Sequence, residues 1–546
     1  MKRILFIFIL LSSNIFAQEK IYDLVGSEFE SGFGLVISGL KDHNQDGIND
    51  FAVLEASTNK VYLFSGANGQ LLNTFEQVDS QSYGNNILSL PDINNDGIPE
   101  IIISDSRATD VFLNPDSGVI YIYSGNPSQN FNLLFDLELF IPAPGSPTNA
   151  RFGTGVAVLG DINNNGFPEI AGGASRFESS RGLVRVQSAN KSSTPWTIEN
   201  NVNDEAMGYN LLAIEDQNND GIKDLLVAFP SDDIPGNNGK VQLLSGANGS
   251  VITTLFPPAN HYVFGCAMRD VGDVTGDGVP DFAISAVSKF NDNFVNIRIY
   301  SGADLSIYRN IPNTPFFCDN GNFAGIGDIN GDGFDEIIVG DSSDINSDNI
   351  VSFKVVSGKT GEELLLSNGS FSEEFAYSVS GLGDINNDLY PEVLVTSLQG
   401  DNRFGKVSVY DVSPKVTNTD IGVNITRKGN FQLNIELERN MTFENCDFTL
   451  YASAKRKRLN TRYSRQPKIL ETKISSEGIN KTVKLKRSIF EVNKKGKTVR
   501  KKIHFRSYIK CGKNENLSKI KSKRIGSNGK PITFRKYLRA LKRKLS

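Results

Sequence analysis

A nine-residue pattern recurs seven times and constrains the fold of this chain more than any other feature. Each copy begins with Asp and carries oxygen-bearing side chains at positions 1, 3, 5 and 9, and six copies have Gly at position 6. The copies begin at Asp42, Asp92, Asp161, Asp216, Asp273, Asp328 and Asp384. Their starts lie 50, 69, 55, 57, 55 and 56 residues apart. The pattern therefore marks a structural unit that repeats through most of the chain.

The flanks of the nonapeptide repeat as well. An aromatic residue followed by Gly, as in Phe33-Gly34, precedes several copies. Three apolar runs follow each copy in the sequence. The first of them is exemplified by residues 100–103 after the second copy. The next two, of which the earlier ends in Ser-Gly, are exemplified by residues 61–66 and 70–75 after the first copy. Four short strands with Gly-rich turns are typical of a propeller blade. We therefore expect an all-β fold with a seven-bladed β-propeller over residues 20–413.

The last blade needs a strand from elsewhere in the chain. No fourth apolar run follows its third before the composition changes at Pro414. A strand-like segment, 20–26, stands immediately before the first repeat, where other units have their fourth strand. An open sheet edge invites pairing with other chains, so we expect residues 20–26 to close the last blade.

The nonapeptides have the chemistry of calcium loops. In a tight loop, positions 1, 3 and 5 turn to the same side, position 7 offers its carbonyl, and the acid at position 9 closes the shell. Oxygen-only donors in a flexible shell favour Ca²⁺ over Mg²⁺. We predict up to seven structural Ca²⁺ ions and no other cofactor. The predicted ligands are Asp42, Asn44, Asp46, Ile48, Asp50; Asp92, Asn94, Asp96, Ile98, Glu100; Asp161, Asn163, Asn165, Phe167, Glu169; Asp216, Asn218, Asp220, Ile222, Asp224; Asp273, Thr275, Asp277, Val279, Asp281; Asp328, Asn330, Asp332, Phe334, Glu336; and Asp384, Asn386, Asp388, Tyr390, Glu392.

Three copies depart from the pattern. Asn165 replaces the position-5 carboxylate, so the site at Asp161 should bind more weakly, and Thr275 replaces the usual Asn at position 3. Leu389 replaces the turn Gly, which makes the site at Asp384 the poorest match. One such loop alone is often only a solvated acidic hairpin. Clustered carboxylates are costly without a cation, however, and seven loops in phase favour metal binding.

Charge separates the chain into two parts. Residues 1–413 contain 21 basic and 53 acidic residues, a net charge of -32, whereas 414–546 contain 36 basic and 9 acidic, a net charge of +27. Such asymmetry indicates two bodies with different partners.

The first 17 residues read as an export signal. Lys2 and Arg3 precede a short apolar run, and Ala17 offers a small residue at a cleavage point. We therefore expect a secreted, cell-surface or periplasmic protein. No apolar stretch reaches the roughly 18 residues of a membrane span, so no transmembrane helix is predicted.

The basic part alternates apolar and polar residues over 419–512, which predicts a small β-sandwich of immunoglobulin-like size. Cys446 and Cys511 either form a disulfide there or are separate buried thiols, and Cys266 and Cys318 are a second candidate pair. Residues 513–546 form a basic tail in which Phe534, Leu538, Leu541 and Leu545 predict a short amphipathic helix. It would engage an anionic surface, dock on the acidic propeller, or remain solvated.

Together, the Phe-Gly pairs and the Asp-x-Asn-x-Asp-Gly loops resemble the FG-GAP (VCBS-like) repeats of integrin α-subunit propellers, over about residues 20–413. The resemblance implies that ligands bind the face opposite the calcium loops. On that face we expect contacts from the loop 104–117 and the insertion 126–150. There is no Arg-Gly-Asp and no inserted adhesion domain.

These features favour an extracellular, calcium-binding adhesion or surface-recognition protein whose propeller face binds a protein or glycan. The alternative is a carbohydrate-processing enzyme or lectin-like accessory module. No catalytic residue is predicted, because His43, His261 and His504 lie in separate regions and no GxSxG or HExxH motif occurs. Nucleic acid is not an expected ligand.

Overall fold

A computed structural model describes most of the acidic part and short segments of the basic part. In the acidic part the described residues are 19–77, 82–110, 114–139, 149–230, 238–288, 294–315, 322–330, 332–341, 350–388 and 390–412. In the basic part they are 421–427, 432–439, 447–453, 468–473, 479–484, 502–511, 514–517 and 521–524. The chain divides near Ser413 into two compact units, and each is described by itself.

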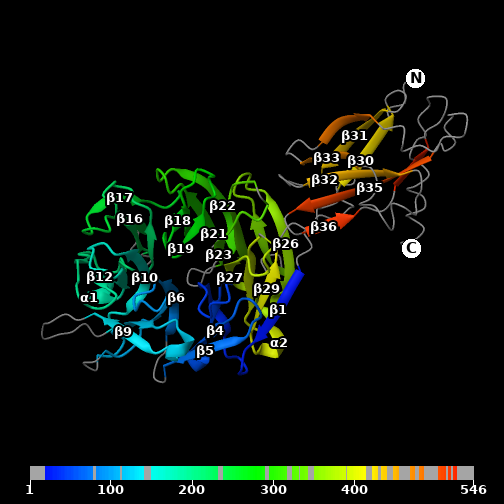
Figure 1. Ribbon diagram of the computed structural model, residues 1–546. Coiled ribbons are helices and arrows are strands. Elements are labelled where there is room, and N and C mark those ends of the chain that lie inside the picture. The colour runs from blue at the N-terminus through cyan, green and yellow to red at the C-terminus, as the bar shows by residue number, and fades with distance from the viewer. Residues whose placement is uncertain are drawn as a thin grey trace, which may run out of the picture. The chain divides into compact units, whose positions relative to one another are not determined.

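The first unit is a seven-bladed β-propeller, as predicted (Figure 1). Blades 1 to 3 consist of β2 (Phe33–Gly39), β3 (Phe51–Glu55), β4 (Lys60–Phe64), β5 (Leu71–Glu76); β6 (Tyr83–Leu90), β7 (Glu100–Asp105), β8 (Val119–Tyr123), β9 (Leu133–Glu138); and β10 (Phe152–Gly160), β11 (Glu169–Ala174), β12 (Leu183–Ser188), β13 (Trp196–Glu199). One-turn helices lie at η1 (Ala56–Thr58), η2 (Pro127–Gln129) and α1 (Phe177–Ser180). The strand β9 accounts for part of the predicted insertion 126–150, because it is the regular fourth strand of blade 2.

Blades 4 to 7 are antiparallel too, and blade 5 has an additional short strand, β18, which pairs with β20 as β19 does. They consist of β14 (Leu211–Ile214), β15 (Asp224–Phe229), β16 (Lys240–Leu244), β17 (Val251–Leu255); β18 (His261–Tyr262), β19 (Met268–Gly272), β20 (Asp281–Ser288), β21 (Phe294–Tyr300), β22 (Ile307–Pro315); β23 (Phe323–Gly327), β24 (Glu336–Asp341), β25 (Ile350–Val356), β26 (Glu363–Ser370); and β27 (Phe375–Gly383), β28 (Glu392–Ser397), β29 (Lys406–Asp411) with β1 (Glu19–Val25). One-turn helices lie at η3 (Phe371–Glu373) and α2 (Gly400–Arg403).

The N-terminal strand β1 is the outer strand of blade 7. It pairs antiparallel with β29, so the sheet order is β1-β29-β28-β27. Tyr22 of β1 donates its hydroxyl to the Gly66 carbonyl of blade 1 over 2.7 Å. Trp196 makes the equivalent bond from the fourth strand of blade 3 to Gly246 of blade 4, over 2.8 Å. The strand β1 therefore makes the contacts to the next blade that a fourth strand makes elsewhere.

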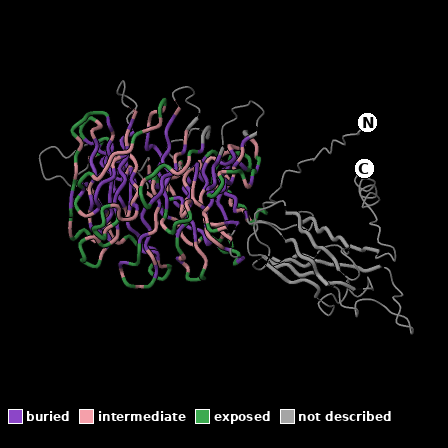
Figure 2. Tube along the Cα trace, turned by 90° about the horizontal axis from the view of Figure 1, so that it is seen from above, coloured by how far each residue is buried: buried purple, intermediate pink, exposed green. Residues whose placement is uncertain are grey.

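The core lies between the blades. The second strand of each blade is packed on both faces, and Ile101, Ile102 and Ile103 of β7 are no more than 1 % exposed. Figure 2 shows the buried residues along the strands in the interior of this unit and the exposed residues mainly at its outer loops. Strands buried on both faces read as continuous apolar runs rather than alternating ones, which is what the sequence shows after each loop.

The aromatic-Gly pair places a ring between neighbouring blades. Phe33, at the start of β2, is 2 % exposed and pairs with Glu55, after which the register shifts before Ile37 pairs with Val53. Gly34 follows with a φ of 94°, which a residue with a side chain rarely adopts. The pair therefore bends the inner strand while its ring fills the interface.

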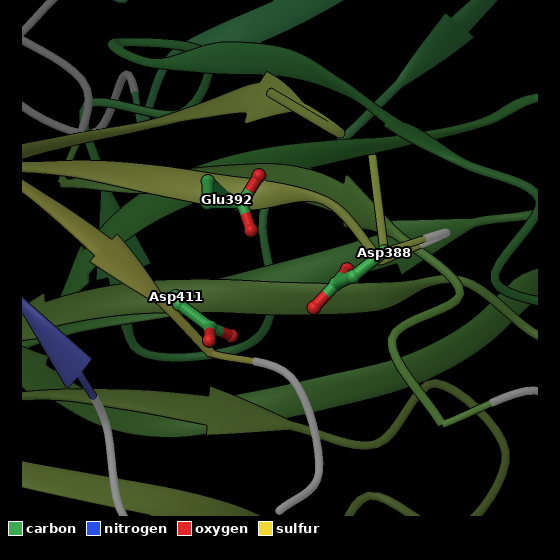
Figure 3. Close-up of side chains that lie close together, drawn as sticks. All are labelled: Asp388, Glu392 and Asp411. Atoms are coloured by element: carbon green, nitrogen blue, oxygen red, sulfur yellow. The ribbon is translucent and has the colours of Figure 1, made fainter. Parts of the chain in front are cut away.

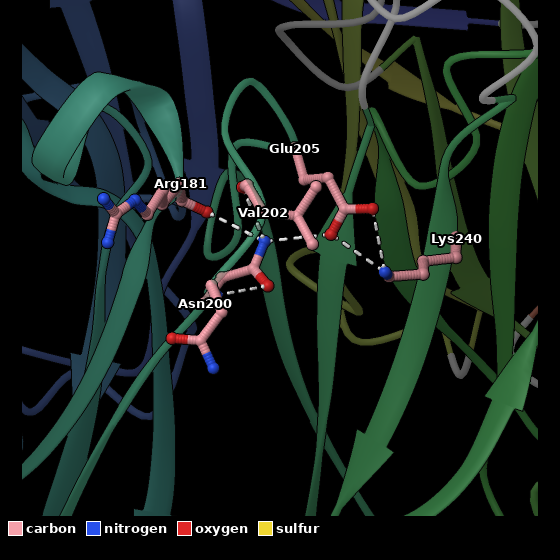
Figure 4. A network of polar contacts seen from close by, with 6 residues as sticks. Arg181, Asn200, Val202, Glu205 and Lys240 are labelled. Atoms are coloured by element: carbon pink, nitrogen blue, oxygen red, sulfur yellow. Dashed lines mark hydrogen bonds and ion pairs between the residues drawn. The ribbon is translucent and has the colours of Figure 1, made fainter.

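A partly buried polar network ties blade 3 to blade 4 (Figure 4). Asn200 donates to the carbonyls of Arg181 and Val202, each over 3.2 Å, and to Glu205 over 2.9 Å. Lys240 of β16 forms an ion pair with Glu205 at 2.9 Å. Glu205 is 6 % exposed, so losing Lys240 would leave a buried charge without its counter-ion. The network fixes the connection between β13 and β14.

The second unit contains two antiparallel sheets. One joins β30 (Ile421–Arg427), β31 (Gln432–Arg439) and β34 (Ile479–Lys484), and the other joins β32 (Asp447–Ser453), β33 (Lys468–Lys473), β35 (Lys502–Cys511), β36 (Asn514–Leu517) and β37 (Lys521–Arg524). Strands thus continue past residue 512, where we expected the tail to begin. The immunoglobulin-like packing of the two sheets stays a prediction.

Several predicted features lie outside the described residues. They include the export signal 1–17, Leu389, the tail helix near Phe534, Cys318 and Cys446, and the side chain of Cys511. Cys266 is disulfide-bonded. Among the described residues, no helix has the length and hydropathy needed to cross a bilayer.

Candidate functional site

All seven nonapeptides form the turn between the inner two strands of a blade. In the first, the Asp42 carboxylate accepts the backbone N–H groups of Asp46, over 3.2 Å, and Gly47, over 2.7 Å. Asp46 accepts in turn from the N–H of Ile48 over 2.9 Å. The N–H groups of the loop therefore hold the side chains of positions 1 and 5 on the inside of the turn.

Backbone dihedrals explain the residue at position 6. Gly47 has a φ of 84°, and nothing lies within 4 Å of the place where its Cβ would stand. The turn requires glycine for its conformation rather than for space. Position 4 is left-handed too, with Gln45 at 61° and Asn95 at 61°. Asn tolerates this region best among residues with side chains, which accounts for its frequency there.

The acid at position 9 lies deepest. Asp50 is fully buried and accepts from the N–H of His43 over 2.8 Å and from the N–H of Gly66 over 3.2 Å. It therefore ties the nonapeptide to the Ser-Gly turn behind the third strand. Burial raises the pKa of Asp50 to about 6 and that of Glu100 to about 7. Burial and neighbouring carboxylates disfavour the ionised form of such an acid, and a bound divalent cation would favour that form.

Glu100 offers a direct test of fit for a cation. Its Oε2 accepts from the N–H of Ile93 over 3.0 Å, whereas its buried Oε1 has no hydrogen-bond partner among the described residues. Buried polar atoms are nearly always partnered, so an acceptor left over beside two further carboxylates fits a cation ligand. The predicted donors of this loop, from Asp92 to Glu100, are all oxygens, as a hard cation requires.

Blade 7 brings together a trio of carboxylates that differs from the predicted one, because it includes Asp411 and not Asp384. Oxygens of Asp388, Glu392 and Asp411 lie within 4.8 Å of one another, and no other such trio is found in the described part of the chain. Figure 3 shows the three carboxylates facing a common space. Burial and neighbouring charge raise the pKa of Glu392 to about 8, with Asp388 and Asp411 as the nearest anions.

Asp411 is a site residue that the sequence analysis missed. It pairs with Glu392 across β28 and β29, in the register that places Ser65 opposite Asp50 in blade 1. In blades 1 to 6 this place is held by Ser65, Ser124, Ser188, Ser245, Ser301 and Ser357. Aligning the third strands by register, rather than by the Ser-Gly signal, would have revealed it. The loop that matched the pattern least well thus gains an additional carboxylate.

Replacing Asp411 with Ser, the residue of the other blades, is expected to have opposite effects with and without calcium. Without calcium, removing one of several neighbouring negative charges should raise the free energy of unfolding by about 1 kcal/mol. With calcium present, the loss of a ligand should weaken the calcium affinity of this blade about tenfold. Thermal melts in EGTA and in calcium measure both signs, with Asp411→Asn as the isosteric control. An equal loss of stability in both conditions would show that Asp411 is only structural.

Comparison with known proteins agrees with the repeat. Residues 42–103 match the family model described as FG-GAP-like repeat. Bovine integrin alpha-2 is 25% identical over 166 residues, which is 27% of this chain and 14% of that protein. Chicken integrin alpha-V is 27% identical over 169 residues, or 30% of this chain and 16% of that protein. Chicken integrin alpha-8 is 24% identical over 155 residues, 26% and 14% of the two chains.

The similarity therefore covers a minor part of each chain, and the match spans about one seventh of the length of these relatives. The matched chain folds into seven propeller sheets with a repeated acidic turn. The first unit is an integrin-α-like β-propeller that contains FG-GAP-like repeat sequence.

Proposed function

We propose that this protein is an extracellular, calcium-stabilised recognition protein of the adhesion type, which binds a protein or glycan ligand through one face of its propeller. The observation that carries the proposal is the set of acidic turns on a single face of the ring, each with oxygen donors on the inside of the loop. Their regularity supports a structural role for calcium, because in blades 1, 3, 4 and 5 the acid at position 9 accepts a hydrogen bond from the third strand of its own blade or from the turn that follows it.

The opposite face supports the recognition role. Strands alternate in direction, so the turns between second and third strands and the starts of the innermost strands lie opposite the nonapeptides. There the axial cavity is lined by Ser82, Asn85, Asn86, Ser106, Ser175 and Tyr209. Its described lining contains two acidic residues, Asp204 and Asp270. A lining rich in neutral hydrogen-bonding groups favours binding over the paired-carboxylate chemistry of the glycosidase alternative.

An array of proteins and glycans, probed with the full chain in calcium and in EGTA, tests the proposal. We expect at least one ligand class to be retained in calcium and lost in EGTA, because the loops hold the blades that build the opposite face. Binding that is identical in both conditions would contradict the calcium part. Hydrolysis of arrayed glycans, read by mass spectrometry, would favour the enzyme alternative instead.

A further inference from the structure

Two adjacent blades carry an arginine at the same place in the repeat. Arg107 and Arg176 each stand seven residues after the position-9 acid of their blade and directly after a serine, Ser106 or Ser175. The other blades have Ser57, Ser231, Ser288, Ser343 and Gln399 at this place. Because the blades repeat in register, the two arginines leave neighbouring turns of the same face, opposite the nonapeptides.

A third arginine, Arg151, lies between these two in the sequence, and hydrogen bonds fix its backbone. Arg151 has a φ of 58°, its N–H donates to the Asp116 carbonyl over 3.0 Å, and its carbonyl accepts from the Thr154 hydroxyl over 2.6 Å. The same left-handed position recurs at Gly32, Ala206, Val263 and Glu374, with φ of 68°, 52°, 50° and 48°. The conformation belongs to the fold, whereas the arginine is particular to blade 3.

All three arginines line the axial cavity, whose volume is about 1320 Å³. A fourth, Arg269 of β19, lines it as well and donates to the Met268 carbonyl over 3.0 Å. The described lining thus holds four arginines against two aspartates, in a part of the chain with 53 acidic and 21 basic residues. The lining of the cavity therefore has a positive net charge, whereas the acidic part of the chain that forms it has a negative net charge.

The charges of Arg151 and Arg176 are not neutralised by an ion pair within the described part of the chain. None of the ion pairs among the described residues involves Arg151 or Arg176. The Nε of Arg151 is buried without a hydrogen-bond partner. Burial, then the charges of Arg176 and Arg107, lower the pKa of Arg151, with Asp116 opposing them. Because the positive charges of these arginines repel one another and are partly buried, the binding of an anion among them is favoured.

We propose that Arg107, Arg151 and Arg176 form a carboxylate-binding site that takes an acidic segment of a partner protein. Guanidinium groups pair with carboxylates through two parallel hydrogen bonds. A Glu or Asp side chain is long and flexible enough to enter the cavity. The described lining has two aromatic residues, Tyr209 and Tyr262, so it offers limited surface for stacking against the rings of an acidic polysaccharide. The inference rests on the proposed recognition function and specifies its ligand.

The experiment uses the full chain in calcium and a short peptide of alternating Glu and Gly that carries a benzophenone. Mass spectrometry then locates the photo-cross-links. We expect cross-links in the turns after β7 and β11, reduced about tenfold or more in Arg151→Gln/Arg176→Gln. The control is Arg298→Gln, which removes an arginine that pairs with Asn310 across β21 and β22, outside the cavity. Cross-links to the basic part, 414–546, serve as an internal reference and should not change.

Three outcomes would overturn the proposal: cross-links confined to 414–546, cross-links that persist in the double variant, or displacement by oligogalacturonate or a sulfated oligosaccharide but not by free Glu-Gly peptide. If the double variant has a lowered melting temperature in calcium, Arg151→Lys/Arg176→Lys replaces it. Lysine keeps the positive charge but cannot form the two parallel hydrogen bonds, so this variant should give an intermediate level of cross-linking. A calcium-dependent ligand on the array without these cross-links would refute the acidic-peptide site alone. An array on which no protein or glycan is retained in calcium would refute the proposed function.

Discussion

Chelating calcium with EGTA is expected to lower the melting temperature of the propeller by at least about 10 °C. A site with calcium at a hundred times its dissociation constant contributes about 2.7 kcal/mol, so several such sites exceed about 10 kcal/mol together. Without the ions, acids as deeply buried as Asp50 and Glu392 face other carboxylates with no cation between them. Differential scanning calorimetry in calcium, in EGTA and in magnesium measures the shift.

Two controls separate site binding from general screening. Sodium chloride at matched ionic strength should not restore the melting temperature, because it screens surface charge without entering the loops. Glu363→Gln, an exposed acid outside the nonapeptides, should leave the calcium dependence unchanged, whereas Asp220→Asn should reduce it. Coincident melts in calcium and EGTA would remove the basis for the seven sites.

Substituting Gly246 with Ala is expected to destabilise the propeller by about 3 kcal/mol, at the upper end of what overpacking costs. A Cβ on Gly246 would overlap the carbonyl oxygen of Lys223, which is backbone and cannot move without the loop. The N–H of Gly246 also donates to Asp224 over 3.2 Å, and its carbonyl accepts from Trp196. One alanine therefore disturbs the turn, the acidic loop and the neighbouring blade. Urea unfolding measured in calcium gives the free energy.

Gly221→Ala is the matched control within the same blade. Gly221 has a φ of 84° and nothing within 4 Å of its missing Cβ, so the substitution should cost only the roughly 1–2 kcal/mol of a left-handed backbone. Steric overlap and dihedral strain are thus tested separately. Equal losses in the two variants would mean that the contact with Lys223 relaxes freely.

Much of the fold was accessible from local signals. The nonapeptide spacing gave the number of blades, and continuous apolar runs such as that of β7 gave strands buried on both faces. The site was accessible in part, because the Asp-x-Asn-x-Asp-Gly pattern states which side chains turn inward. Asp411 was not, since its neighbours in sequence do not carry the pattern and only the pairing of β28 with β29 brings it to Glu392.

The arginines of the axial cavity show the same limit. Arg107 and Arg151 are separated by more than a strand pair in sequence, and no spacing rule connects them to Arg269. They become one feature only when the ring brings the innermost strands around a common cavity.

By itself, the sequence determined the repeat, the all-β class and the acidic turns, because each depends on residues within a few positions of one another. The sequence also predicted that residues 20–26 close blade 7, which is where the structure places β1. The tertiary structure alone decided which acid joins the loop of that blade and which cations line the axial cavity. Those outcomes depend on strand register and on closure of the ring, which join residues hundreds of positions apart, such as Lys20 and Tyr410.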